Sequence, residues 1–276
     1  MTAHKNPVQR QPEPQVLEAV TSLVEASRGR TARRPLVLGV CGAQGSGKST
    51  LAAGLVEAAR ARGLAAATLA LDDLYLTRAE RAVLAHEVHP LLATRGVPGT
   101  HDVALGLDLL ARIGAGEAVR LPRFDKRTDD RTPEVEWGAA PAPLDLLVFE
   151  GWCVGAVAED ETALVEPVNA LEREDDADGR WRRWVNAELA RDYQRLFARI
   201  DVLVLLAAPG FEVVAQWRTE QEQAGAGVMD APAIAHFVQH YERLTRHILA
   251  EMPDRADLVI RLDRDRRPVG IVSRSS

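Results

Sequence analysis

The stretch Gly42-Ala43-Gln44-Gly45-Ser46-Gly47-Lys48-Ser49 decides how the rest of the chain is interpreted. It follows an apolar run at residues 35–41 and opens into a helical pattern at residues 50–62. Glycines let the backbone turn tightly, so that several N–H groups converge on an anion at the positive end of a helix. This context predicts a P-loop that binds the phosphates of a nucleoside triphosphate, rather than a turn that only connects a strand to a helix.

The individual positions of this loop predict its ligands. Lys48 adds a mobile positive charge that reaches the β- and γ-phosphates, and the Ser49 hydroxyl is a ligand for magnesium. The predicted cofactors are therefore ATP and Mg²⁺. We expect the nucleotide to contact the following residues: Gly42, Ala43, Gln44, Gly45, Ser46, Gly47, Lys48, Ser49 and Thr50.

Composition limits the classes of partner. The chain has 276 residues, 46% of them apolar, which suits a globular α/β protein with a sizeable core. Its net charge of −6 disfavours nucleic-acid binding, so we expect local basic clusters to serve a small anionic substrate. No apolar run approaches the length of a membrane span, and residues 1–13 lack the apolar core of a signal peptide. We expect a cytoplasmic protein; composition does not predict its oligomeric state.

Cysteine and histidine usage does not indicate a metal site. Cys41 and Cys153 are too few for a disulfide framework, and each ends a predicted buried strand where a small apolar residue is expected. His86, His89 and His101 lie close in sequence, but no carboxylate-rich ligand set accompanies them.

Alternating apolar runs and helical patterns predict the fold class. Apolar runs recur at the following positions: residues 36–41, 66–71, 144–149, 202–207 and 258–262. Such runs are typical of strands buried on both faces of a parallel sheet, and helical patterns separate most of them. We predict a doubly wound, mostly parallel α/β sheet of P-loop NTPase type with helices on both faces, in a single domain over residues 15–276 after a mobile tail at 1–14.

Three segments have patterns of their own. An i, i+3, i+4 apolar stripe from Trp181 to Ile200 predicts one helix packed on the core. A second helix is predicted from Asp230 to near Pro253. Residues 261–272 favour a hairpin at the sheet edge, with a solvated turn at 264–267 as the alternative.

Two long insertions interrupt the regular alternation. Residues 74–143 separate the second and third predicted strands and mix helices with loops. Residues 155–180 form an acidic stretch. Insertions of this length are more often functional lids or pockets than inert loops.

Carboxylates follow two of the predicted strands. Asp72 and Asp73 end the second strand, and Glu150 ends the third. The carboxyl ends of parallel strands meet at one edge of the sheet, where the P-loop also emerges and where ligands bind. A carboxylate at a buried strand end becomes favourable beside Mg²⁺ or a reacting hydroxyl. The alternative for one member of the aspartate pair is that it caps the next helix.

Four motifs resemble a known family. They are Asp-Asp-Leu-Tyr at 72–75, Arg-Gly-Val-Pro-Gly-Thr-His-Asp at 95–102, Arg-Phe-Asp-Lys at 123–126 and Glu-Gly-Trp-Cys at 150–153. Over residues 35–249 the chain resembles the D-glycerate 3-kinase family of P-loop kinases, related to uridine kinase, phosphoribulokinase and pantothenate kinase. The resemblance implies an ATP-dependent phosphotransferase with an alcohol group as acceptor. The expected acceptor is the hydroxyl of D-glycerate or a similar hydroxy acid.

The resemblance also implies roles for residues. Asp72 corresponds to the base on the acceptor hydroxyl, and Glu150 to a residue that helps to hold the magnesium shell, which requires the third strand to lie beside the first. Segments 95–102 and 123–131 would shape the acceptor pocket, since their basic residues suit a small carboxylate. The expected substrate residues are the following: Asp73, Tyr75, Arg95, His101, Asp102, Arg123, Asp125, Lys126 and Arg131. For each basic residue, a solvated surface charge is the alternative.

Residues 211–226 correspond to the lid that related kinases close over the phosphates. Arg218 is then the candidate that stabilises the charge on the transferring phosphoryl group, and it joins Lys48 and Asp72 in the predicted catalytic set. Lids of uridine-kinase type carry several basic residues, whereas this segment offers one before residues 223–227. An ordinary salt bridge explains Arg218 equally well.

Two other function classes remain open from the sequence. A nucleotide-controlled switch of GTPase type needs an Asn-Lys-x-Asp motif, which the chain lacks, and its Asp-x-x-Gly at 176–179 lies in the acidic stretch rather than after a strand. A P-loop kinase for another acceptor, such as a nucleoside, pantothenate or a sugar, shares the same fold.

Overall fold

The computed structural model describes residues 11–28, 35–224 and 230–274. Residues 1–10 of the predicted mobile tail lie outside this part of the chain, and helix α1 (Pro14–Arg28) already begins at the last residue of that predicted tail. Part of the predicted lid, residues 225–226, also lies outside it.

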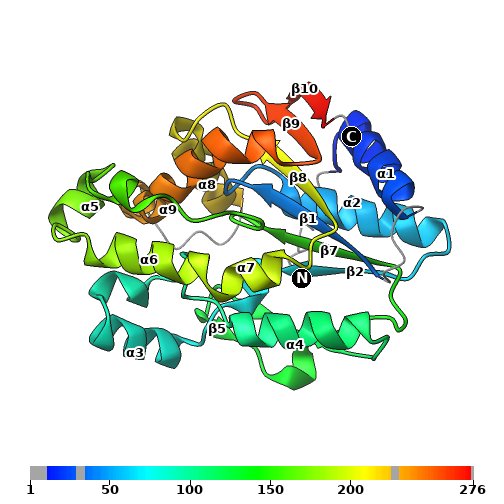
Figure 1. Cartoon of the computed structure of the whole chain (residues 1–276), viewed down its shortest axis with the longest axis horizontal. Coiled ribbons are helices and arrows are strands. Elements are labelled where there is room, and N and C mark those ends of the chain that lie inside the picture. Colours follow the sequence, from blue (N-terminus) through cyan, green and yellow to red (C-terminus); the bar gives the residue numbers. More distant parts are fainter. Residues whose placement is uncertain (1–10, 29–34, 225–229, 275–276) are drawn as a thin grey trace, which may run out of the picture.

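A central parallel sheet organises the molecule (Figure 1). Within the described residues it has six strands in the order β10-β9-β8-β1-β7-β2. The strand bounds are β1 (Leu36–Gly42), β2 (Ala66–Ala70), β7 (Leu146–Gly151), β8 (Val202–Ala207), β9 (Leu258–Leu262) and β10 (Pro268–Ser273). All pairings except β9–β10 are parallel. The predicted doubly wound α/β fold is therefore confirmed.

Strand β7 lies between β1 and β2, as the resemblance required. Its register sets Val40 opposite Glu150 and Cys41 opposite Gly151. The end of β7 is thereby brought beside the start of the P-loop.

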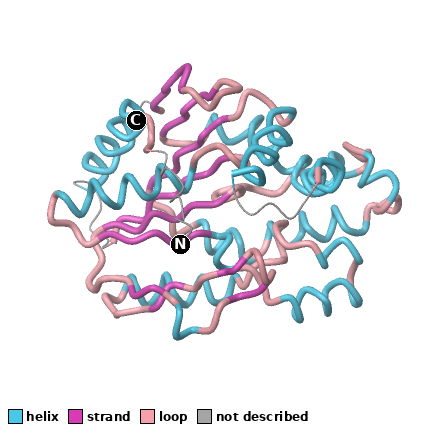
Figure 2. Tube along the Cα trace, turned by 180° about the vertical axis from the view of Figure 1, so that it is seen from behind, coloured by secondary structure: helices cyan, strands magenta, loops and turns pink. Residues whose placement is uncertain are grey.

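Alternation along the strands divides the core into two layers, and helices lie on both sides of the strands (Figure 2). In β1, Leu36, Leu38 and Val40 pack with helices α1, α2 (Lys48–Ala61) and α8 (Glu212–Ala224), whereas Val37 and Cys41 pack with α4 (Val103–Gly114) and α7 (Asp192–Phe197). Helix α9 (Ala231–Glu251) contributes to both layers. Every helix in the described ranges is too short or too polar to span a bilayer.

The first insertion, residues 74–143, folds into several small elements. They are 3₁₀ helix η1 (Leu71–Leu74) at its start, α3 (Arg78–Glu87), η2 (Pro90–Ala93), α4, η3 (Glu134–Glu136) and two small two-stranded sheets. One sheet pairs β3 (Arg120–Leu121) with β6 (Gly138–Ala139), and the other is a hairpin of β4 (Phe124–Asp125) and β5 (Asp130–Arg131).

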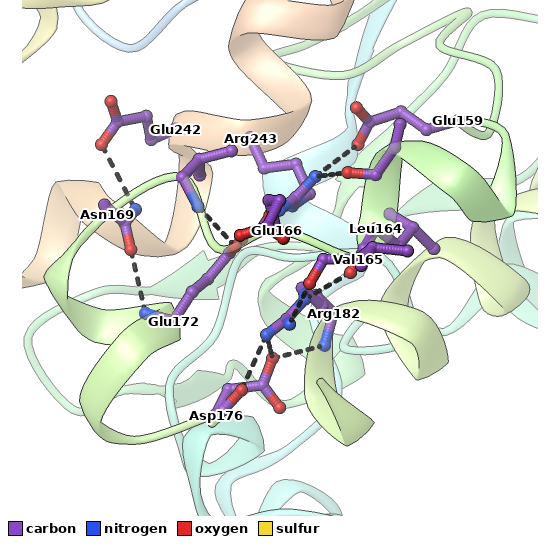
Figure 3. Close-up of polar contacts among 12 residues, drawn as sticks. Glu159, Leu164, Val165, Glu166, Asn169, Glu172, Asp176, Arg182, Glu242 and Arg243 are labelled. Atoms are coloured by element: carbon purple, nitrogen blue, oxygen red, sulfur yellow. Dashed lines mark hydrogen bonds and ion pairs between the residues drawn. The ribbon is translucent and has the colours of Figure 1, made fainter. Parts of the chain in front are cut away.

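The acidic stretch at 155–180 is packed against the domain by buried ion pairs (Figure 3). It contains η4 (Glu161–Leu164) and α5 (Ala170–Glu174), and it leads into α6 (Arg180–Ala190). Glu172, with 1% of its side chain exposed, accepts bonds of 2.8 and 2.7 Å from the Arg243 guanidinium on α9. Asp176 accepts a bond of 2.9 Å from Arg182 on α6. These carboxylates therefore serve packing rather than a solvated surface.

The predicted helix from Trp181 to Ile200 is wrong in one respect, because the chain breaks it into α6 and α7. Arg191, with φ −94° and ψ −117°, leaves helical geometry between them. The apolar stripe on both sides of the break is buried or half-buried and packs against the hydrophobic clusters, so its interpretation as core packing is confirmed.

The last predicted elements are confirmed. The Asp230 carboxylate caps α9 by accepting a bond of 2.9 Å from Ala233 N, and the helix ends at Glu251, before η5 (Met252–Asp254). Strands β9 and β10 form the expected edge hairpin. Its turn is not fully solvated, since Arg266 is 15% exposed and donates from Nε to the P-loop carbonyl of Gly45 at 2.6 Å.

Candidate active site

The P-loop has the backbone that its glycines predict. Gly45 (φ 80°) and Gly47 (φ 94°) adopt left-handed conformations, and helix α2 begins directly after Gly47. A Cβ on Gly45 would lie 2.6 Å from the Trp217 Cβ, so the loop packs closely against α8. The Lys48 ammonium donates to the Ala43 carbonyl at 3.1 Å and therefore lies over the loop.

Ser49 and Glu150 meet beside the P-loop. The Ser49 hydroxyl donates to Glu150 Oε1 at 2.6 Å. Glu150 is 6% exposed, and burial raises the pKa of its carboxyl, with the nearby Lys48 ammonium opposing this effect. Two hard oxygen donors are thus held together at the carboxyl edge of the sheet, where a cation would offset the cost of burying the carboxylate.

Asp72 lies in η1, across the site from the P-loop. Its carboxylate accepts a bond of 2.8 Å from the Tyr75 hydroxyl and one of 2.6 Å from the Lys126 ammonium. Burial alone would raise the pKa of the Asp72 carboxyl, but the charge of Lys126 and these two hydrogen bonds outweigh it and hold the pKa well below its usual range. Asp72 is therefore ionised at neutral pH.

These groups share one pocket. It is lined by the P-loop, by η1 and the first insertion, by the end of β7, and by helices α8 and α9. The lining residues are Gln44, Gly45, Lys48, Ser49, Asp72, Tyr75, Arg95, Lys126, Glu150, Trp152, Arg218, Phe237 and Tyr241.

Arg95 and Arg218 bring two further cations to this pocket. The Arg95 side chain is 17% exposed and pairs with Asp129 through Nη1. The Arg218 guanidinium lies 5.4 Å from the centre of the Phe237 ring. Both arginines, together with Lys48 and Lys126, surround the space in front of Asp72 with positive charge.

Known proteins resemble this chain in sequence and in fold. The uncharacterized kinase mug58 of Schizosaccharomyces pombe is 36% identical over 261 residues, which cover 86% of this chain and 91% of that protein. Among solved structures, the D-glycerate 3-kinase of Cryptococcus neoformans var. grubii has a TM-score of 0.79 at 27% identity, over 95% of this chain and 100% of that one. The chain belongs to the D-glycerate 3-kinase family of P-loop kinases.

A further sequence relative is also named a D-glycerate 3-kinase. The chloroplastic D-glycerate 3-kinase of Arabidopsis thaliana is 27% identical over 259 residues, 85% of this chain and 54% of that longer protein. No family model matches the chain. The fold and these relatives identify the protein as a phosphotransferase.

Asp73 does not line the pocket. Asp73 Oδ1 accepts a bond of 3.0 Å from Phe124 N, and Oδ2 accepts one of 3.1 Å from Arg123. Adjacent aspartates in η1 thus diverge: Asp72 lines the pocket, whereas Asp73 and Arg123 attach the β4–β5 hairpin to the end of strand β2. Asp73 does not cap α3 either, since Thr77 and Glu80 form that cap.

Four other predicted substrate residues lie outside the pocket lining. Arg131 donates to Asp102 at 3.2 Å and to the Tyr75 carbonyl at 3.0 Å, and Asp102 also caps α4. Asp125 pairs with its neighbour Arg127 at the surface. His101 is buried behind Tyr75, with the rings stacked at 4.7 Å, and burial lowers the pKa of its imidazole to about 3.

Three aromatic residues line the pocket without having been predicted to do so. Trp152 follows Glu150 within a recognised motif, but a tryptophan after a strand equally suits the core. Phe237 and Tyr241 belong to the apolar face of α9, whose periodicity indicates burial and does not indicate what the helix faces. Across the described ranges, no group of three or more His, Cys, Asp or Glu side chains is arranged to hold a metal ion.

Proposed function

We propose that this kinase transfers the γ-phosphoryl group of ATP to a hydroxyl of D-glycerate or a similar small hydroxy acid. One observation carries the proposal. A single pocket contains the P-loop Lys48, the ionised Asp72 and the cations Arg95 and Lys126. It therefore combines a phosphate-binding loop, a proton acceptor and positive charge suited to a carboxylate.

Magnesium fits the donor set beside the P-loop. The Ser49 hydroxyl and Glu150 carboxylate supply hard oxygen ligands, and Mg²⁺ in kinase sites is usually held by one or two protein groups together with the nucleotide phosphates. The hydrogen bond between them holds the two oxygens 2.6 Å apart. When bound, the ion neutralises charge on the β- and γ-phosphates.

The chain's own residues supply positioning and electrostatics. Lys48 lies over the P-loop to meet the phosphates, and Arg218 lines the same pocket with its guanidinium over the Phe237 ring. The acceptor hydroxyl oxygen forms a bond to the γ-phosphorus as the bond to ADP breaks, and the hydroxyl proton passes to Asp72. A carboxylate with a lowered pKa takes this proton late, as the oxygen loses electron density to phosphorus.

The acceptor side of the pocket supports a small anion. Of the basic residues in the first insertion, Arg95 and Lys126 line the pocket and pair with Asp129 and Asp72, respectively. Arg123 and Arg131 lie outside the lining, where they pair with Asp73 and Asp102. Relatives of this chain are named D-glycerate 3-kinases. Glycerate, a carboxylate with two neighbouring hydroxyls, offers one group for these cations and one for Asp72.

An acceptor panel tests the proposal. ADP release is measured with ATP and Mg²⁺ in the presence of glycerate, other hydroxy acids, sugars, nucleosides and pantothenate, with Lys48→Ala as the inactive control. Glycerate or a similar hydroxy acid should stimulate ADP release most strongly. Stimulation only by a sugar, a nucleoside or pantothenate would reassign the acceptor, and nucleotide binding without turnover would indicate a switch.

A further inference from the structure

A second carboxylate, Asp129, lies behind the acceptor side of the pocket and contacts two arginines. Asp129 belongs to the turn between β4 and β5 and has a left-handed backbone, with φ 56°. One of its oxygens accepts a bond of 2.5 Å from Arg81, and the other pairs with Arg95. Asp129 belongs to segment 123–131, which is expected to shape the acceptor pocket, but it is not one of the expected substrate residues.

Arg81 is a buried cation that fixes the position of Asp129. Its side chain is 1% exposed, and its guanidinium donates to the carbonyls of Leu76, Ala93 and Asp129 as well as to the Asp129 carboxylate. A buried guanidinium requires this degree of hydrogen bonding and a counter-ion. Arg81 therefore holds Asp129 in place, and Arg81 itself does not line the pocket.

Arg95 is held on several sides. Besides Asp129, its guanidinium lies 5.6 Å from the centre of the Phe124 ring, and its carbonyl accepts a bond of 2.9 Å from the Tyr241 hydroxyl. Phe124 is itself fixed by the bond from its N–H to Asp73. The pair with Asp129 uses only Nη1 of Arg95, so the guanidinium retains donors for another anion.

The triad of Arg81, Asp129 and Arg95 carries a net positive charge. Two guanidinium groups share one carboxylate, and of the three residues only Arg95 lines the pocket. The excess positive charge is thus available there, in a fixed orientation. A preorganised guanidinium binds a carboxylate with less loss of side-chain entropy than a mobile one, and can do so through two parallel hydrogen bonds.

We propose that Asp129 is a positioning residue that acts through Arg95 and makes the pocket selective for an acceptor bearing a carboxylate. This inference rests on the proposed function. It concerns acceptor recognition and not the phosphoryl-transfer step, because neither Asp129 nor Arg81 lines the pocket.

The test compares charged and neutral acceptors in Asp129→Asn. Asparagine tolerates the left-handed backbone and keeps the shape of the side chain, but it removes the charge that holds Arg95. The measurement is kcat/KM for glycerate relative to its neutral amide, glyceramide, together with KM for ATP. We expect the preference for glycerate to fall by about tenfold or more, mainly through KM for glycerate, with KM for ATP within about twofold of wild type.

Asp102→Asn is the matched control. Asp102 also pairs with a half-buried arginine of the same insertion, Arg131, but neither residue lines the pocket, and asparagine caps α4 as well as aspartate does. Its preference for glycerate should equal that of the wild type. A purely structural role of Asp129 would instead lower activity with both acceptors equally.

A second variant distinguishes a loss of stability from a loss of the preference for glycerate. Asp129→Asn leaves Arg81 as a buried cation without its carboxylate, whereas Arg81→Met/Asp129→Asn removes both charges and still frees Arg95. The same loss of preference is expected in the double variant. A folded double variant that keeps the wild-type preference overturns the inference alone; a wild-type protein without glycerate-dependent turnover overturns the proposed function and this inference with it.

Discussion

Asp72 and Asp73 are adjacent in the chain and directed to different partners. Asp72 lines the pocket, and Asp73 holds Phe124 N and Arg123. We expect Asp72→Asn to lower kcat by about 10²–10⁴-fold, because it removes a general base while keeping the shape of the side chain. ATP binding should survive. Asp73→Asn should retain most of the turnover and lose stability on the order of 1 kcal/mol with its hydrogen bonds.

Acceptor-dependent ADP release and thermal midpoint, measured for both variants, separate the two roles. The assignment is wrong if Asp73→Asn is the inactive protein and Asp72→Asn is merely less stable.

Glu150 is expected to help to hold magnesium, so its substitution should change the Mg²⁺ requirement. Glu150→Gln keeps the contact with Ser49 but removes the negative charge that would hold the ion. Half-maximal activity should require about tenfold more Mg²⁺, with KM for the acceptor unchanged. Titration of activity against Mg²⁺ at saturating ATP measures this, and a curve identical to that of the wild type would leave Glu150 a structural role only.

Local sequence predicted the residues that touch the nucleotide side of the pocket better than those on the acceptor side. Lys48, Ser49 and Glu150 follow from a loop motif and from the ends of buried strands. In contrast, Arg131 forms an ion pair with Asp102, 29 positions away in the chain, and Arg123 forms one with Asp73, 50 positions away. Such pairings arise only when the insertion folds against the sheet, so the sequence offers a set of basic residues without showing which of them are neutralised.

At the scale of elements, the apolar runs predicted the strands closely because strands buried on both faces carry an unbroken signal. The bounds of β8 and β9 equal those predicted, and β2 ends one residue early, where Leu71 begins η1. The break at Arg191 was not predictable from periodicity, since the apolar stripe continues across it with helical spacing.

The acidic stretch gives an element-scale prediction. Arg243 joins α9 to Glu172 and, at 3.7 Å, to Glu159, and it also donates to the carbonyls of Ala163 and Glu166 (Figure 3). Arg243→Met leaves a buried carboxylate without its partner, so the free energy of unfolding should fall by about 3 kcal/mol.

Denaturant unfolding measures this loss, and Arg246→Met is the control on the same helix. Arg246 pairs with Glu242 at 2.7 Å but is 56% exposed, so its loss should cost less than about 1 kcal/mol. Equal effects of the two substitutions would show that the stretch is not held by its buried pairs.

For the molecule as a whole, two buried histidines predict how stability depends on pH. Burial lowers the pKa of His101 to about 3, and burial with the neighbouring His236 lowers that of His240 to about 4. Below the unfolded pKa of about 6.5, the unfolded chain binds protons that the folded protein does not, so the free energy of unfolding falls as pH decreases. Each histidine contributes a slope of up to about 1.4 kcal/mol per pH unit down to its folded pKa.

Unfolding free energies measured between pH 7 and 5 test this slope. His101→Gln should flatten the dependence, whereas His86→Gln, at an exposed position, should leave it as in the wild type. The explanation fails if His101→Gln loses stability by a constant amount at every pH.

The sheet order brings the P-loop, Glu150 and Asp72 to one edge, and the insertion and α9 close the pocket over them. The central claim is that this pocket moves the γ-phosphoryl group of ATP onto a hydroxy acid. The most direct measurement follows labelled phosphorus: the purified protein is incubated with γ-labelled ATP, Mg²⁺ and D-glycerate, and the products are identified by mass spectrometry. Labelled phosphoglycerate should form in step with ADP, and its rate of formation should fall by about 10²–10⁴-fold in Asp72→Asn. Label that appears only as inorganic phosphate, or on another acceptor while glycerate stays unmodified, would contradict the account.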